Sequence, residues 1–104
     1  MSKNKWLAAG AVVFLLAGGG IVATTYNPQG GSFSEAPAEG GQWEHGSSAG
    51  RTWSHFLHDQ SHGARIKGRE DVDSGCVPGG EWARAQGPSR ILVILGDEQE
   101  YYLC

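Results

Sequence analysis

The chain has 104 residues, and its eight lysines and arginines against eleven aspartates and glutamates give a formal net charge of −3 at pH 7. This weakly acidic balance excludes nucleic acid as an expected partner, because binding to a phosphate backbone requires grouped basic residues. Seventeen glycines and few large aliphatic residues after the N-terminal part predict a small hydrophobic core.

An uncharged run begins directly after Lys5, and residues 6–23 are apolar or glycine throughout. An α-helix rises about 1.5 Å per residue, so about 20 residues cross the roughly 30 Å hydrocarbon core of a bilayer. Trp6 and Tyr26 stand where interfacial aromatic residues are expected. We therefore predict a transmembrane α-helix over residues 6–26, in contact with the lipid bilayer.

The basic residues around this run predict its orientation. Lys3 and Lys5 precede the run, and the next basic residue is Arg51. The positive-inside rule then places residues 1–5 in the cytoplasm and the chain from residue 27 onward on the other side. The expected localisation is a single pass through the inner or cytoplasmic membrane, with a periplasmic or extracellular C-terminal region.

A cleaved signal peptide is the alternative interpretation of the same run. Two lysines form a positive N-terminal region, and the segment Ile21-Val22-Ala23 provides a small-residue cleavage site, so residues 1–23 would be removed. Because the run is longer than the usual apolar region of a signal peptide, the retained anchor is the leading prediction. Both interpretations export the remainder of the chain.

Small residues near the end of the run form two pairs at a spacing of four. Gly19 pairs with Ala23, and Gly20 pairs with Thr24. On a membrane helix such pairs let a second helix approach closely, which predicts a helix-packing surface. The alternative is that glycine is simply frequent in membrane helices.

The exported part divides by composition. Residues 27–50 are dominated by Gly, Ser, Pro and Glu and predict a flexible linker. Residues 51–104 form a small exported region with two cysteines, Cys76 and Cys104, that should pair in an oxidising compartment. On the chain-entropy model this disulfide stabilises the fold by about 3 to 4 kcal/mol.

Residues 51–66 are predicted to form one short helix with an apolar stripe. Three histidines, His55, His58 and His62, fall together on the opposite face. Imidazole suits zinc or copper, so a metal site is one hypothesis, although three ligands over two turns cannot all reach one ion without a further ligand. The other hypotheses are a solvated polar face and a pH-responsive contact.

The last residues predict a β-hairpin over 91–104. Ile91–Leu95 is a strongly strand-forming run, residues 96–99 form a turn, and Glu100–Cys104 returns. The first strand is apolar on both faces, so both faces require burial. The exported region has too few other apolar residues to cover both, which favours a protein partner.

The expected fold is thus a single transmembrane α-helix plus a small, irregular, Gly-rich exported segment with one short helix and a C-terminal β-hairpin. We predict a single-pass accessory or structural subunit that packs on a larger membrane protein complex, such as a photosynthetic or respiratory one. Neither catalysis nor a cofactor is expected. The alternative is a small exported binding module held by the disulfide, with metal bound through the histidine cluster and residues 1–23 cleaved as a signal peptide.

Overall fold

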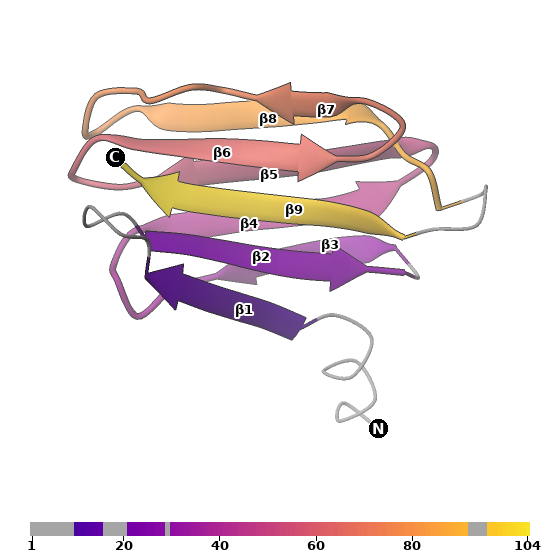
Figure 1. The fold of residues 1–104 in the computed structure, drawn as a ribbon, viewed down its shortest axis with the longest axis horizontal. Coiled ribbons are helices and arrows are strands. Elements are labelled where there is room, and N and C mark those ends of the chain that lie inside the picture. Colours follow the sequence, from indigo (N-terminus) through magenta and orange to yellow (C-terminus); the bar gives the residue numbers. More distant parts are fainter. Residues whose placement is uncertain (1–9, 16–20, 29, 92–95) are drawn as a thin grey trace.

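The computed structural model describes residues 10–15, 21–28, 30–91 and 96–104, and throughout these ranges the chain is all β. Nine strands in the described residues form two antiparallel sheets, with sheet A in front of sheet B in Figure 1. No helix is present in this part of the chain, and hence none that is long and apolar enough to cross a membrane. The predicted fold class is therefore wrong.

Sheet A has the strand order β1-β2-β9-β6-β7, and sheet B has the order β3-β4-β5-β8. The strands of sheet A are β1 (Gly10–Leu15), β2 (Ile21–Asn27), β9 (Asp97–Leu103), β6 (His62–Lys67) and β7 (Asp71–Asp73). The strands of sheet B are β3 (Gly31–Glu35), β4 (Gln42–Ser48), β5 (Arg51–Leu57) and β8 (Trp82–Pro88).

The uncharged N-terminal run contributes strands where a transmembrane helix over 6–26 was predicted. β1 pairs with β2, and β2 pairs with β9 along its whole length, from Ile21 opposite Leu103 to Asn27 opposite Asp97. β2 is rich in isoleucine, valine and threonine, and β1 contains two valines; such branched residues favour the pleated conformation. An apolar run without charges fits a buried strand as well as a helix. Residues 6–9 and 16–20 lie outside the described residues.

The helix predicted over 51–66 is also wrong, because this segment forms β5 and all of β6 except its last residue, Lys67. Inward and outward positions alternate along β5, with Thr52, Ser54 and Phe56 buried between the sheets. β5 is a central strand that pairs with β4 on one side and β8 on the other. Backbone pairing on both sides outweighs the weak helical pattern.

Two further segments differ from the prediction. Residues 27–50, expected to form a flexible linker, contain β3 and β4, which are paired with each other. The strand predicted over the last residues exists as β9, which pairs with β2 on one side and β6 on the other. Ile91 lies in a turn, and residues 92–95 of the strand predicted over 91–95 lie outside the described residues.

The core between the sheets is small and strongly polar. Several of its largest fully buried side chains are polar, including His45, His62, Gln99 and Asp97. Such groups are tolerated in an interior only when they are hydrogen-bonded, so the sandwich requires a connected polar network. The buried apolar residues are Ala23, Trp43, Phe56, Ala64, Ile66, Ala83, Ala85 and Tyr101.

Two turn glycines separate the effect of backbone conformation from that of close packing. Gly41 and Gly50 both have a left-handed φ, +85° and +80°, but only Gly41 is crowded. A Cβ at Gly41 would lie 2.2 Å from the carbonyl oxygen of Leu57, whereas one at Gly50 would meet nothing within 4 Å. Gly50→Ala should lower the free energy of unfolding by about 1 kcal/mol, and Gly41→Ala by several times that amount. Urea unfolding measures both, and equal losses would contradict this packing.

Candidate functional site

The three histidines of the predicted metal site do not converge on one point. His55 lies on the outer face of sheet B. His58, directly after β5, and His62, at the start of β6, are buried. The rings of His58 and His62 are 6.3 Å apart between centroids. In the described residues no group of three or more His, Cys, Asp or Glu side chains could hold a metal ion.

Both buried rings use their nitrogens for backbone hydrogen bonds. The His58 Nδ1 accepts from the Gln60 N–H at 3.0 Å, and its Nε2 donates to the Glu39 carbonyl at 3.0 Å. In His62 both nitrogens lie 2.6 Å from carbonyl oxygens, those of Gln60 and Glu81. Carbonyl oxygens only accept, so both ring nitrogens of His62 face backbone acceptors and neither is directed at a metal. These two histidines act as hydrogen-bonding members of the core.

His45 is fully buried and lies between two aromatic rings. Its ring stacks on Trp43 at 3.8 Å and on Phe33 at 5.3 Å between centroids. Nε2 lies 2.5 Å from a carboxylate oxygen of Glu35, and Nδ1 lies 3.1 Å from Oε1 of Gln99. Both ring nitrogens of His45 are thus engaged by side-chain partners, one of which is a carboxylate.

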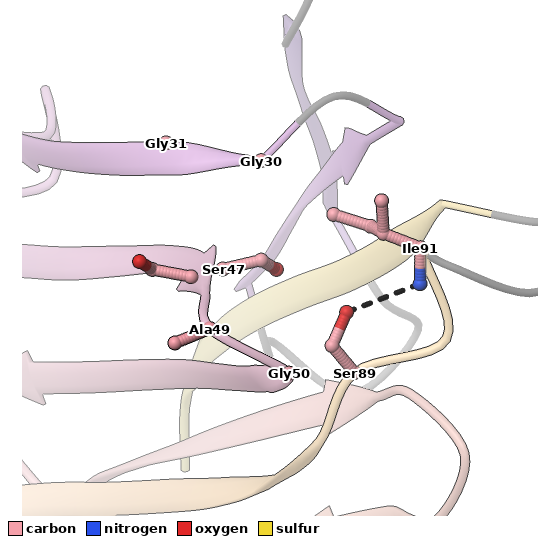
Figure 2. A pocket seen from close by; sticks show the side chains of 8 residues that line it. Gly30, Gly31, Ser47, Ala49, Gly50, Ser89 and Ile91 are labelled. Carbon is pink, nitrogen blue, oxygen red and sulfur yellow. Dashed lines mark hydrogen bonds between the residues drawn. The ribbon is translucent and has the colours of Figure 1, made fainter.

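A pocket of about 540 Å³ opens beside this polar interior, at the end of the sandwich formed by the β4–β5 turn (Figure 2). Ala49 and Gly50 form that two-residue turn with left-handed φ values of 53° and 80°, as a tight hairpin of the primed type requires. The pocket combines bare glycine backbone, small hydroxyl side chains, the Ala49 methyl group and the larger aliphatic side chain of Ile91. Its lining residues are Gly30, Gly31, Ser47, Ser48, Ala49, Gly50, Ser89 and Ile91.

The pocket hydroxyls are held by a buried carboxylate. Ser47 and Ser89 donate to the same Asp97 oxygen at 2.6 and 2.5 Å, and the Arg90 backbone N–H donates to the other oxygen at 2.7 Å. The Ser89 oxygen also accepts from the Ile91 N–H, the dashed line in Figure 2. Ser47 and Ser89 are thereby fixed in position, so the pocket presents ordered polar groups to a ligand.

Sequence reasoning did not find Asp97 and its two serines. They come from three separate segments of the chain, and only the fold brings them together. No local spacing links them, so the single-sequence pattern carried no usable signal.

Two other groups of predicted site residues have defined places. Cys76 and Cys104 are joined by a disulfide with their Cα atoms 6.3 Å apart, which ties the loop before β8 to the end of β9. In the predicted helix-packing set, Ala23 is buried in the core, and Thr24 points outward and donates to Glu100 at 3.1 Å. A strand places these neighbours on opposite faces, so they form no common packing surface. Gly19 and Gly20 lie outside the described residues.

Removing the disulfide should be costly in so small a fold. Cys76 and Cys104 are 28 positions apart, and opening a loop of that size lowers the free energy of unfolding by about 3 to 4 kcal/mol on the chain-entropy model. The Cys76→Ser/Cys104→Ser variant should show this loss in urea unfolding. A reductant should lower the wild-type protein to the same stability and leave the variant unchanged. A wild-type stability that is insensitive to reductant would contradict the prediction.

His55 should titrate below the usual range. Partial burial lowers its pKa from the ordinary 6.5, and the Arg84 guanidinium lowers it further. Arg84 donates to the His55 Nδ1 at 3.4 Å. Folding therefore favours the neutral ring, and this contribution to stability is present above pH 6.5 and is lost as pH falls through the lowered pKa.

An NMR titration of the His55 ring protons checks this directly. The wild-type midpoint should lie below 6.5, and Arg84→Gln should raise it part of the way back, because burial remains. A wild-type midpoint at or above 6.5 would show that the ring is neither desolvated nor opposed by Arg84.

Fold and site together define a small, disulfide-bonded β-sandwich with a polar core and a pocket suited to binding. The chain belongs to the lactococcin 972 family of bacteriocins, whose family model matches residues 39–102, more than half of the sequence. The matched segment runs from the connection before β4 into the last strand, β9, and includes Asp97. No curated protein and no solved structure matches the chain.

This membership corrects the predicted function and localisation. The chain was expected to be an accessory subunit of a membrane complex with a single pass through the inner membrane, and both predictions are wrong. A bacteriocin family indicates a secreted protein, and the described parts of the apolar run form strands of sheet A. The findings agree better with the alternative, a small exported, disulfide-bonded module.

Proposed function

We propose that this protein is a secreted bacteriocin that inhibits the growth of other bacteria by binding at their surface, without catalysis and without a metal or cofactor. The observation that carries the proposal is the family match over residues 39–102. A bacteriocin acts on bacteria other than its producer, so the chain must remain folded outside the cell that makes it.

The architecture supports an extracellular binding role. The described strands are arranged in two antiparallel sheets, and the disulfide joins Cys104 to the loop at Cys76. Such a bond persists in an oxidising environment and limits unfolding of a domain with few apolar residues. A binding role is supported by the pocket, where Asp97 holds the hydroxyl groups of Ser47 and Ser89 in fixed positions.

Export through residues 1–23 as a cleaved leader is part of this proposal. Cleavage after Ala23 would remove β1 and the first three residues of β2. The four remaining residues of β2, from Thr24 to Asn27, would keep their partners Glu100 to Asp97 on β9. Sheet A would therefore retain a paired strand on that side of β9.

Growth inhibition by the purified protein tests the proposal. The oxidised protein is collected from the culture medium, its intact mass is measured to locate the N-terminus, and dilutions are applied to a panel of Gram-positive and Gram-negative bacteria. We expect concentration-dependent inhibition of some strains, and at least tenfold weaker inhibition by the Cys76→Ser/Cys104→Ser variant at 37 °C, because a loss of about 3 kcal/mol populates the unfolded chain. Folded, oxidised protein that inhibits no strain would reject the function.

A further inference from the structure

The outer face of sheet B carries a regular arrangement of aromatic and planar polar side chains. All described strands belong to one of the two sheets, and sheet A packs on the inner side of sheet B, so no described strand covers this outer face. Alternation along β4, β5 and β8 directs every second side chain outward. The outward residues are Gln42 and Glu44 on β4, Arg51, Trp53, His55 and Leu57 on β5, and Trp82, Arg84 and Gln86 on β8.

The register arranges the centre of this face as a polar row across three strands. Glu44 stands opposite His55, and His55 stands opposite Arg84. Arg84 donates to the His55 ring and lies 5.3 Å from the centre of the Trp82 ring. On β4, the Gln42 amide donates to Glu44 at 3.0 Å. These contacts hold the polar side chains in defined positions.

Two tryptophans lie on either side of this row. Trp53 stands opposite Gly46, which has no side chain to cover the indole. Trp82 lies on the edge strand β8, opposite Leu57 of β5. Both tryptophans are partly exposed. They are four positions apart along the strands and one strand apart across them, so their Cα atoms are separated by about 14 Å. An extended oligosaccharide covers that span, whereas a single sugar does not.

The composition of the face selects among classes of partner. Stable protein docking sites commonly present a contiguous apolar patch, but on this face the rings of Trp53 and Trp82 are only partly exposed and a polar row separates them. Nucleic acid requires clustered basic residues, and here Arg51 and Arg84 are accompanied by Glu44. Nearly balanced charge, aromatic rings and planar amide, carboxylate and guanidinium groups match an uncharged, polyhydroxylated chain.

We propose that the outer face of sheet B is a binding site for a linear, uncharged glycan. The indoles of Trp53 and Trp82 stack on the apolar faces of two separated sugar rings, and Glu44, Arg84 and Gln86 exchange hydrogen bonds with the hydroxyl groups between them. Glycan binding to this face does not depend on antibacterial activity. A negative glycan titration would therefore leave the bacteriocin proposal standing, and a negative growth-inhibition assay would leave the glycan proposal standing.

Titration of the full, oxidised chain with β-1,4-linked neutral hexasaccharides of glucose and of N-acetylglucosamine tests the site. NMR should show shifts of the indole N–H signals of Trp53 and Trp82. Trp43 provides an internal control, because its indole N–H is buried and donates to Ser54 at 2.9 Å. Calorimetry should show that Trp53→Ala and Trp82→Ala each weaken binding roughly tenfold. Tyr26→Ala, which removes an exposed aromatic residue from sheet A, should leave binding unchanged.

Four outcomes would overturn the proposal. They are no binding of either hexasaccharide, shifts at Trp43 without shifts at Trp53 and Trp82, equal affinity in the tryptophan variants, and association with phosphatidylglycerol vesicles in place of glycan. Should a tryptophan variant fail to fold, Arg84→Ala and Gln86→Ala replace it, because both side chains are exposed. Each of these should then weaken binding several-fold, and unchanged affinity in both would also reject the site.

Discussion

The interior of the protein depends on one buried amide, the side chain of Gln99. From the middle of β9 in sheet A it reaches across to sheet B, where its nitrogen donates to Thr52 at 2.9 Å and its oxygen accepts from His45. Two residues earlier on the same face of β9, Asp97 accepts from Ser47 and Ser89. A core with few large apolar side chains is thus joined by directed bonds between the sheets. Because an unpaired buried polar group is costly, these bonds specify one relative placement of the sheets.

Strand β9 makes this arrangement possible because it occupies the centre of sheet A. It is paired with β2 on one side and β6 on the other, so its inward side chains face the middle of sheet B. Its outward side chains are equally constrained, since Glu100 accepts from Arg65 at 2.6 Å and from Thr24. The disulfide at Cys104 then fixes the end of this strand. The two sheets, the pocket and the C-terminus are therefore organised by one segment of seven residues.

The sequence allowed part of this fold to be predicted, and physical reasons explain the rest. The strand character of the C-terminal residues and the two cysteines were accessible, because both are local signals. Segment 51–57 was misread because Trp53 and Leu57, four positions apart, share a face on a helix and also on a strand. The alternation that identifies a strand was hidden, since the inward residues Thr52 and Ser54 are polar. The uncharged run after Lys5 likewise did not distinguish a strand from a helix.

The candidate site was less predictable than the fold. Metal ligation was inferred from histidines close in sequence, but alternation sends His55 outward while His58 and His62 become interior donors and acceptors. The pocket serines and Asp97 gave no pattern because their proximity exists only after three segments assemble. The aromatic face of sheet B required the register between strands, which composition and spacing along one strand do not contain.

The connection between β3 and β4 illustrates how a glycine- and proline-containing segment is kept closed to proteases. Glu39 is attached to the interior twice, through its carboxylate, which accepts from the Tyr101 hydroxyl at 2.5 Å, and through its carbonyl, which accepts from His58. Four residues earlier, Glu35 is attached to His45. A protease must draw an extended stretch of backbone into its cleft, and here that would break three bonds to buried rings at once. A secreted chain with this composition can thereby persist in a medium that contains foreign enzymes.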